Sequence, residues 1–415
     1  MELLIVSHKR CWPSQMSPTG FATDGGFAFQ AAALSALFDR TTLLVPVAPA
    51  PETEGEIALR GDDLSVKPLT VPRGLGFRRK LNLALWLARN LGTLLGEIRR
   101  AGAVHAPIPG DVGTLGMLLA YLLRKPFLVR YCGNWDARRN VSERFWHWFM
   151  EATAGGRNVM LATGGRATPP SARNPNVKWI FATSLSEEEL RGCYARNVEH
   201  RISSPRLILA GRQEPGKGAD VVIESLPRII EHFPGTTLGI VGDGSALGDL
   251  KEQAVLRGLS DRVVFHGRVS HERVLALFRQ ADLFCYPTSS EGFPKVVIEA
   301  MACGLPVVTT PVSVLPRLLA AGGGVLIQKP SAGEVCRAVQ DCLANPARYS
   351  LMSERAVATA KEYSLESWGA AIGDLLRQSW GRLKSDPVVA VPDGPIGFIE
   401  KIEPPLRFAS RRGID

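Results

Sequence analysis

The stretch that decides the fold is residues 282–308, which read DLFCYPTSSEGFPKVVIEAMACGLPVV. Residues 282–286 and 305–309 are continuous β-rich runs, mostly apolar, of the kind that form strands buried on both faces. Residues 295–303 between them have a helical pattern, and Pro294 suits the first position of a helix because its missing N–H is not needed there. A strand, a helix and a second strand in this order predict a parallel sheet with a crossover helix.

The same alternation continues along most of the chain. We expect further strands near residues 2–6, 42–47, 103–106, 127–131, 158–162 and 178–181 in the first half, and near 206–210, 237–241, 263–267 and 324–327 in the second. We expect further helices near 26–38, 79–99, 113–123, 219–232, 246–257, 271–279, 332–343 and 366–380. The strands form two groups of six, which predicts an α/β protein with two Rossmann-like domains rather than one sheet.

Changes in composition indicate where the domains end. Residues 184–205 are polar and contain no obvious strand, so we place the boundary there, with a first domain at 1–190 and a second at 200–365. The helical segment 366–383 follows the second domain. Residues 384–415 contain five prolines and little periodicity, and we expect an irregular tail.

The net charge is concentrated in one part of the chain. The 415 residues carry a formal charge of +9, and residues 73–144 hold 13 basic and 4 acidic residues, a difference that equals the whole excess. Such an asymmetry favours an anionic partner, which is a membrane surface, a nucleic acid or a phosphorylated substrate. No nucleic-acid recognition motif accompanies the charge, so we expect no nucleic-acid partner.

Several classes of protein are excluded by composition and patterning. The longest apolar run near the middle reaches back to Val112 and is too short for the roughly 20 residues of a bilayer span. The order of charge and apolar residues at the N-terminus is wrong for a signal peptide. The seven cysteines contain no C-x-x-C pair, which disfavours a disulfide framework or a structural zinc site. We therefore expect a reduced, cytoplasmic protein.

The helical segment 79–99 has two interpretations. An apolar stripe that includes Leu81, Leu85 and Ile98 predicts packing against the core, with Arg99 and Arg100 complementing the helix dipole. The alternative is an interfacial helix that lies on anionic lipid.

Two glutamates, eight positions apart, lie before and within the helix predicted at residues 295–303. Glu291 lies on the loop after strand 282–286, and Glu299 lies one to two turns into the following helix. Ligands of open α/β sheets bind at the carboxyl ends of the strands, where two carboxylates can accept hydrogen bonds from the hydroxyl groups of a ribose or another polyol. The alternative is that neither binds a ligand: Glu291 only caps the helix, and Glu299 is an ordinary helix glutamate.

A second loop has the composition of a phosphate-binding turn. Residues 211–218 read GRQEPGKG, follow strand 206–210 and open the helix at 219–232. Glycines allow backbone N–H groups to approach phosphate, and a helix N-terminus favours anions. Arg212 and Lys217 add two cations, although a solvated basic turn is the alternative.

Weaker signals lie at other strand ends. Gly242 follows strand 237–241, and His266 lies near the end of strand 263–267. In the first half, Gly25 and Gly26 open the helix at 26–38 and form a second candidate phosphate loop. We expect His105 to end strand 103–106 at the edge of the same crevice.

Taken in order, these motifs resemble a known family. The residues GR-x4-KG, GDG, FHGRV and YPTSSEGFPKVVIEAMACGLPVV are similar to the retaining glycosyltransferases of family 4, which have the GT-B fold. The resemblance covers residues 206–365 and is weaker before them. It implies two Rossmann-like domains that face each other across a cleft, with the nucleotide sugar on the second domain and the acceptor on the first.

The resemblance also assigns roles to residues. Arg212 and Lys217 match the pair that holds the diphosphate, Glu299 matches the ribose-binding glutamate, and Glu291 matches the one that contacts the transferred sugar. The backbone N–H groups of Gly292 and Phe293, the loop of Gly25 and Gly26, Gly242 and His266 complete the implied donor site, and His105 with Glu291 makes the implied catalytic set. Pro294 and Cys132 depart from the family, which often has glycine and histidine there.

The resemblance implies the chemistry as well. Family members keep the anomeric configuration, and the leaving phosphate accepts the acceptor's proton. Cations and helix N-termini neutralise that phosphate, so we expect no metal or other cofactor. The implied partners are a nucleotide sugar and a glycan or lipid-linked acceptor, with an anionic membrane surface at residues 73–144 as a further candidate. The alternatives are an epimerase, a phosphorylase or a non-catalytic binding module.

Overall fold

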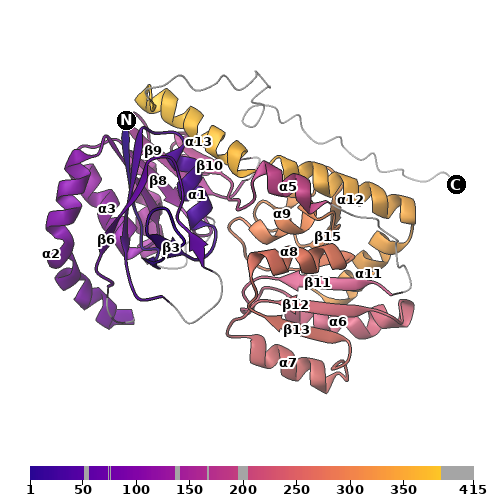
Figure 1. The fold of residues 1–415 in the computed structure, drawn as a ribbon. Helices are drawn as coiled ribbons and strands as arrows, with labels where there is room; N and C mark the ends of the chain where they lie inside the picture. The colour runs from indigo at the N-terminus through magenta and orange to yellow at the C-terminus, as the bar shows by residue number, and fades with distance from the viewer. Residues whose placement is uncertain are drawn as a thin grey trace.

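Two α/β domains with parallel sheets make up the described part of the chain (Figure 1). The computed structural model describes residues 1–50, 56–72, 74, 76–135, 141–165, 168–194 and 204–384. Arg73, Arg138 and Arg139 of the basic stretch lie outside these residues. So does the predicted tail from residue 385 onward.

The sheet of the first domain has seven strands in the order β10-β9-β8-β7-β1-β4-β6. Their bounds are β1 (Glu2–Val6), β4 (Arg40–Pro46), β6 (Leu64–Leu69), β7 (Ala103–Ile108), β8 (Phe127–Tyr131), β9 (Asn158–Thr163) and β10 (Val177–Ile180). Every neighbouring pair is parallel. The chain moves outward from β1 first to one side and then to the other, which is the doubly wound arrangement predicted from the alternation.

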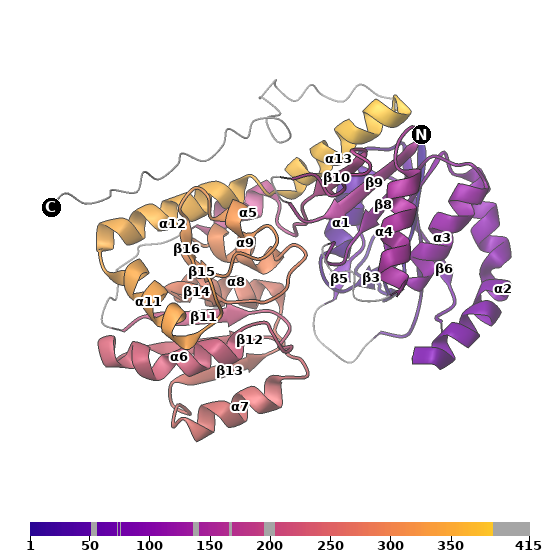
Figure 2. The same cartoon turned by 180° about the vertical axis from the view of Figure 1, so that it is seen from behind.

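Helices cover both faces of this sheet. On one face, α1 (Phe27–Ser35) and α13 (Leu365–Trp380) pack into one core. On the other, α2 (Gly76–Arg100), α3 (Asp111–Leu122) and α4 (Val141–Thr153) pack into a second core, and Figure 2 shows these three helices from behind. Three short strands, β2 (Trp12–Pro13), β3 (Phe21–Thr23) and β5 (Ile57–Ala58), form a separate antiparallel sheet.

Some elements of the first domain differ from the sequence prediction. Strand β6 was not predicted, because its sequence LSVKPL lacks the continuous apolar run that marks a strand buried on both faces, and it lies at the edge of the sheet. The stripe predicted for α2 is displaced: Leu85 is 64% exposed, whereas Trp86, Leu94 and Ile98 are buried. Trp86 turns inward because its Nε1 donates to the Thr70 carbonyl at 2.5 Å. The inner face of α2 therefore packs against the core, as the first interpretation of segment 79–99, a core-packed helix, predicts.

The sheet of the second domain has six strands in the order β13-β12-β11-β14-β15-β16. Their bounds are β11 (Arg206–Ala210), β12 (Thr237–Val241), β13 (Val263–Gly267), β14 (Leu283–Tyr286), β15 (Val307–Thr309) and β16 (Gly324–Leu326). All six were predicted. The helices are α5 (Glu187–Cys193), α6 (Ala219–His232), α7 (Leu247–Leu256), α8 (His271–Gln280), α9 (Lys295–Ala302), α10 (Leu315–Leu318), α11 (Ala332–Leu343) and α12 (Pro346–Lys361).

The structure moves the domain boundary toward the N-terminus. The sequence predicts a first domain that ends at residue 190, but Leu185, Leu190 and Cys193 pack into the core of the second domain. A capping box at Ser186 and Glu189 begins α5 there, a signal that was overlooked within the polar stretch. Helix α13 then returns to the first domain, where Trp368 and Ile372 are buried (Figure 1).

Loops at the carboxyl ends of the two sheets touch each other. Asn134, which follows β8, donates from Nδ2 to Ser290 Oγ at 3.2 Å, and Ser290 follows β14. Asp24 of the first domain lies 3.4 Å from Arg268 Nη2, just after β13. The predicted ligand-binding edges of the two sheets therefore face each other.

None of the helices in the described part of the chain combines the length and the apolar character needed to cross a membrane.

Candidate functional site

Glu291 is held in place by two donors of the second domain. Its Oε1 accepts hydrogen bonds from Lys217 Nζ and from the Tyr286 hydroxyl. Burial and the neighbouring carboxylate raise the pKa of Tyr286, so its hydroxyl stays protonated and keeps donating. Lys217 also donates to the Ser290 carbonyl at 3.1 Å. The loop after β14 is thereby fixed to the loop that precedes α6.

Glu299 lies buried on α9 and is also held by two partners. Ser184 Oγ donates to its Oε1 at 2.8 Å, and His271 Nε2 lies 3.3 Å from the same atom as an ion pair rather than a well-directed hydrogen bond. Burial raises the pKa of Glu299, but His271, Ser184 and Lys295 together outweigh burial and lower it. In turn, the Glu299 carboxylate raises the pKa of His271. Glu299 is therefore an ionised hydrogen-bond acceptor at neutral pH.

The loop at 211–218 turns sharply before α6, at glycines in the left-handed region. Gly216 and Gly218 both have positive φ, of 82° and 90°, and a Cβ on Gly218 would lie 2.6 Å from the Pro287 carbonyl oxygen. This close approach places the N-terminus of α6 beside the loop after β14. The Arg212 side chain is exposed and makes no hydrogen bond or ion pair with the described residues. It is a cation without a partner beside Lys217.

Gly242 and His266 lie at the ends of β12 and β13. Gly242 has a φ of 117°, and a Cβ there would lie 1.9 Å from the carbonyl oxygen of Gly211, so glycine lets the loop after β12 pass directly over the loop at 211–218. His266 is half-buried, and burial lowers its pKa. Its Nε2 would lie 3.3 Å from a Cβ on Gly239, over the neighbouring strand.

The loop at Gly25 and Gly26 faces the second domain. Gly26 is the N-cap residue of α1, and a Cβ there would lie 2.5 Å from Lys295 Nζ and 3.4 Å from Ser184 Cβ. Gly25 has a φ of 63° and lies next to Lys9, which pairs with Asp24. The predicted first-domain loop therefore approaches α9 and Glu299 directly.

Gly292 and Phe293 lie between Glu291 and α9. Among the described residues, neither of their N–H groups donates a hydrogen bond. The Gly292 carbonyl accepts from Ser313 Oγ at 2.6 Å, and the Phe293 ring packs near Phe181 and Tyr363. The backbone is thus anchored while two donors remain free for a ligand.

His105 does not lie where the sequence analysis expected. Strand β7 continues to Ile108, so His105 is inside the strand and only 3% exposed. Burial and Arg130 lower the pKa of His105 to about 3, and its Nδ1 lies 3.0 Å from the Leu128 carbonyl oxygen. The strand-end position is therefore wrong, and the neutral ring is part of the buried side of the sheet. A catalytic role for His105 stays a prediction, which this position does not favour.

Sequence reasoning missed several residues that complete the site. Tyr286 is the last residue of β14, and His271 follows Ser270, the N-cap of α8. Both stand at strand or helix ends, which was an available signal. Ser184 and Lys295 are recognisable only from the fold, because Ser184 lies far from Glu299 in sequence and Lys295 resembles an ordinary helix residue.

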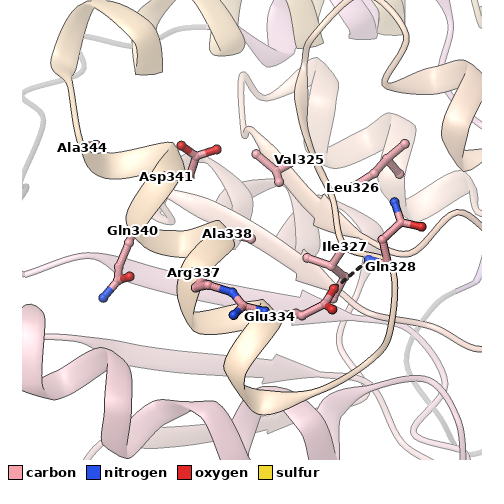
Figure 3. Close-up of a pocket in the computed structure, with 10 residues that line it drawn as sticks. All are labelled: Val325, Leu326, Ile327, Gln328, Glu334, Arg337, Ala338, Gln340, Asp341 and Ala344. Carbon is pink, nitrogen blue, oxygen red and sulfur yellow. Dashed lines mark hydrogen bonds between the residues drawn. The ribbon is translucent and has the colours of Figure 1, made fainter. Parts of the chain in front are cut away.

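A hollow of about 540 Å³ lies elsewhere in the second domain, between β16 and α11 (Figure 3). Its lining includes Glu334, which accepts hydrogen bonds from the backbone N–H groups of Gln328 and Lys329. It contains none of the predicted site residues, so we do not assign the site to it.

The chain is similar to known proteins in sequence and in structure. Residues 196–359 match the family model described as "Glycosyl transferases group 1". The GDP-mannose-dependent alpha-(1-6)-phosphatidylinositol monomannoside mannosyltransferase of Mycolicibacterium smegmatis is 31% identical over 185 residues, which are 41% of this chain and 47% of that protein. The D-inositol 3-phosphate glycosyltransferase of the same organism is 30% identical over 220 residues, 51% of this chain and 47% of that protein.

The match to each of these curated relatives spans about half of the relative's length. The structural likeness is broader. The crystal structure of Anabaena HepE in complex with UDP and glucose superposes with a TM-score of 0.65 at 17% identity, covering 91% of this chain and 100% of that one. The sequence similarity therefore ties residues 196–359 to the group 1 glycosyl transferases, and the structural likeness confirms that the chain has the GT-B fold of two Rossmann-like domains.

Proposed function

We propose that this protein is a retaining glycosyltransferase of family 4 that moves a sugar from a nucleoside-diphosphate sugar to a glycan or lipid-linked acceptor. The observation that carries the proposal is the arrangement around Glu291 and Glu299. Two carboxylates, a free Arg212 and two free N–H groups at Gly292 and Phe293 gather where the carboxyl ends of the two sheets face each other.

In this proposal the second domain binds the donor. The Glu299 carboxylate accepts hydrogen bonds from the ribose hydroxyls, and Glu291 accepts from a hydroxyl of the transferred sugar. Arg212, Lys217 and the N-terminus of α6 hold the diphosphate. Lys217 has three donors, of which Glu291 and the Ser290 carbonyl use two, so one is left for a phosphate oxygen.

The same groups account for the chemistry. As the bond between the sugar and the diphosphate breaks, negative charge develops on the leaving phosphate. Fixed cations and N–H donors stabilise that charge without having to reorganise. The leaving phosphate takes the proton of the acceptor hydroxyl, which attacks from the same face, so the anomeric configuration is retained. We propose that no metal takes part.

Donor turnover tests this function. Release of nucleoside diphosphate is measured with UDP-glucose, GDP-mannose and related donors, with and without glycan or lipid-linked acceptors, and the anomeric configuration of the product is read by NMR. We expect acceptor-dependent turnover with retention that EDTA does not abolish. An isomerised donor without acceptor, or binding without turnover, would contradict the proposal. Activity lost with EDTA and restored by magnesium would contradict its metal-free part.

The acceptor side includes a surface suited to a membrane. Helix α4 exposes Val141, Phe145 and Trp148 along one face, and Trp148 is 57% exposed. The end of α3 exposes Tyr121 and Leu122, and the Tyr121 ring lies 5.6 Å from that of Phe149 on α4. Arg124 and Lys125 follow the end of α3 in the chain, and Arg144 is a residue of α4. Aromatic side chains beside basic ones are typical of surfaces that lie on anionic lipid, so we place the protein at the cytoplasmic face of a membrane.

Vesicle co-sedimentation tests the membrane surface. We expect the protein to bind vesicles that contain anionic lipid more strongly than neutral ones, and Trp148→Ser combined with Phe145→Ser to reduce that binding. Leu256→Ser removes a comparably exposed side chain of the second domain and serves as the control. Equal binding to neutral vesicles would count against the charge argument.

A further inference from the structure

A small hollow lies at the amino-terminal edge of the first sheet. Its volume is about 200 Å³, far more than the roughly 15 Å³ that one water molecule needs. Phe127 and Asn158, which begin the neighbouring strands β8 and β9, are part of its lining. The rest of the lining comes from Tyr121, Arg124, Lys125 and Arg157. The hollow is therefore separate from the candidate site, which is built at the carboxyl ends of the strands.

The lining of this hollow is strongly basic. Arg124, Lys125 and Arg157 contribute three cations, and none of the lining residues is acidic. Both arginines are exposed, and neither side chain makes a hydrogen bond or an ion pair with the described residues. Lys125 Nζ donates to the carbonyl oxygens of Arg99 and Ala101 at 2.7 and 2.8 Å, which leaves one of its three donors. Such a set of donors suits an anion with several acceptor oxygens, and a phosphate group is one.

Arg124 stands at a backbone position that favours glycine. It follows the C-cap residue of α3 with a φ of 54°. Its N–H donates to the Tyr121 carbonyl at 3.0 Å, and the Lys125 N–H donates to the Ala120 carbonyl at 2.9 Å. This pair of bonds is a Schellman motif, which usually has glycine in the left-handed position. Glycine would fit with less strain, so the turn itself gives no reason for an arginine.

Arg157 is fixed from two sides. Its carbonyl accepts hydrogen bonds from the Phe127 N–H at 3.3 Å and from Trp380 Nε1 at 2.8 Å. The first bond joins it to β8 and the second to α13. A ligand in the hollow therefore meets a backbone that is already ordered, which lowers the entropic cost of binding.

Apolar side chains continue from the rim of the hollow. Tyr121 lines it, and the Tyr121 ring packs edge-on against Phe127 and Phe149, with ring centroids 6.3 and 5.6 Å apart. Leu122, the next residue, is 73% exposed. Phe149 in turn lies 6.4 Å from the ring of Phe145 on the exposed face of α4. A basic hollow beside exposed apolar side chains matches a phospholipid, which carries a phosphate next to its acyl chains.

We propose that this hollow binds the phosphate group of an anionic phospholipid. Arg124 and Arg157 donate to the phosphate oxygens together with the remaining donor of Lys125, while Tyr121 and Leu122 enter the outer layer of the bilayer. The inference rests on the membrane part of the proposed function and names the partner of that surface at a defined site. Helix α4 leads from the end of β8 to the start of β9, so its exposed face joins the hollow to the edge where the acceptor binds in the proposed function.

Vesicle co-sedimentation tests the hollow against a surface that acts by charge alone. The full chain is mixed with vesicles of phosphatidylcholine with or without phosphatidylglycerol. We expect the double variant Arg124→Gly, Arg157→Gln to bind the phosphatidylglycerol vesicles at least about tenfold more weakly, because hydrogen bonds to a charged group are lost. The double variant Arg124→Lys, Arg157→Lys keeps the charge but loses the planar fork of the guanidinium, and we expect it to bind about threefold more weakly or worse.

Two controls accompany these variants. Arg99→Lys makes the same conservative change at an exposed arginine that does not line the hollow, and Lys329→Gln removes one exposed charge from the second domain. Both are expected to bind as the wild type does. If the double lysine variant also binds as the wild type does, the surface acts by charge alone and the proposal is overturned.

Thermal melting separates a loss of binding from a loss of folding. Glycine relieves the strain at a φ of 54°, so Arg124→Gly is expected to melt at or above the wild-type temperature while it binds vesicles more weakly. A variant that melts at a lower temperature and binds vesicles as the wild type does would assign Arg124 to folding and contradict the proposal.

A soluble phosphate is the alternative occupant. Leu122→Ser removes an apolar side chain beside the hollow without changing the charge, and we expect it to weaken vesicle binding. Glycerol 3-phosphate carries the phosphate without acyl chains, so calorimetric titration should show binding at least about tenfold weaker than that of the vesicles. If glycerol 3-phosphate binds as tightly as the vesicles do and Leu122→Ser changes nothing, the hollow serves a soluble phosphate and the lipid proposal is overturned.

Donor turnover distinguishes this site from the proposed activity. A protein whose vesicle binding depends on Arg124 and Arg157, but which releases no nucleoside diphosphate from any donor, would keep the lipid site and lose the proposed glycosyltransferase. Acceptor-dependent turnover by a protein whose vesicle binding ignores both arginines would keep the activity and overturn the lipid site.

Discussion

At the scale of single residues, Glu291 and Glu299 have different environments despite their shared motif. Glu291 accepts from a lysine and a tyrosine at the rim of the site. Glu299 is buried between Ser184 of the interdomain segment and His271 of α8. In the proposed function the first contacts the transferred sugar and the second binds the nucleoside.

Replacing Glu291 or Lys217 tests the assigned roles. We expect Glu291→Ala and Lys217→Ala each to lose at least about tenfold in kcat/KM, because about 1.4 kcal/mol of transition-state stabilisation corresponds to a factor of ten. Glu252→Ala, on the exposed side of α7, is the matched control. Steady-state release of nucleoside diphosphate is the measurement, and wild-type rates in both site variants would contradict the assignment.

The pair of His271 and Glu299 predicts a pH dependence of stability. The pKa of His271 is raised in the folded protein, whereas an unfolded histidine titrates near about 6.5. The stabilisation is therefore complete below about pH 6.5 and is lost as pH rises through the higher folded-state pKa. We expect the melting temperature of the wild type to exceed that of His271→Gln at pH 5.5 and the difference to shrink by pH 8.5. A difference in melting temperature that is the same at both pH values would mean that the charge on His271 contributes nothing to stability.

At the scale of elements, glycines allow the loops of the site to approach one another. Gly242 passes over the Gly211 carbonyl, Gly218 approaches the Pro287 carbonyl, and Gly26 makes room for Lys295. Each of these contacts joins a loop after one strand to a loop after another. The separate motifs become one site because backbone can approach backbone at these positions.

Gly242→Ala tests this close approach. The new Cβ would lie 1.9 Å from the Gly211 carbonyl oxygen at a φ of 117°, so we expect a loss of at least about 2 kcal/mol in the free energy of unfolding. Gly258→Ala also has a positive φ, of 66°, but has open space around it and should cost only about 1–2 kcal/mol. Chemical denaturation compares the two, and equal losses would show that backbone conformation alone matters.

At the scale of the whole molecule, the C-terminal helix stabilises the N-terminal domain. Helix α13 follows the second domain in sequence, yet Trp368, Ile372 and Leu376 are buried with α1 and strands of the first sheet. The first domain therefore has an incomplete core until the end of the described chain has been made. The two domains are also connected by Ser184 and Glu299 and by Asn134 and Ser290.

Ile372→Ala is expected to destabilise the first domain specifically. Truncating a buried isoleucine costs roughly 2–5 kcal/mol. Hydrogen exchange followed by mass spectrometry should show faster exchange in β1 and β4 with little change in β11 and β12. Gln378→Ala, on the exposed face of the same helix, is the control. Faster exchange confined to the second domain would contradict the role assigned to α13.

The sequence by itself determined the alternating α/β architecture and all six strands of the second sheet. It also determined that two glutamates and a glycine-rich basic loop lie at the carboxyl ends of those strands. These features depend on local patterns of apolar residues, glycines and charges, which a single segment contains. Strand β6, helix α5 and the position of His105 were not determined in this way. An edge strand lacks the apolar signal, a polar capping box resembles a linker, and the end of a strand depends on its neighbours in the sheet.

Only the tertiary structure decided which residues from the two domains meet. Ser184 donates a hydrogen bond to Glu299, and Lys295 Nζ lies against Gly26. The Arg130 guanidinium lies over the ring of Trp368. Each pair joins segments that are far apart in the chain, and nothing in the spacing of either segment specifies the other. These donors and charges become buried only when the sheets, the helices and the returning α13 have packed. Burial matters because an unpaired charge is unfavourable inside the protein but not in water.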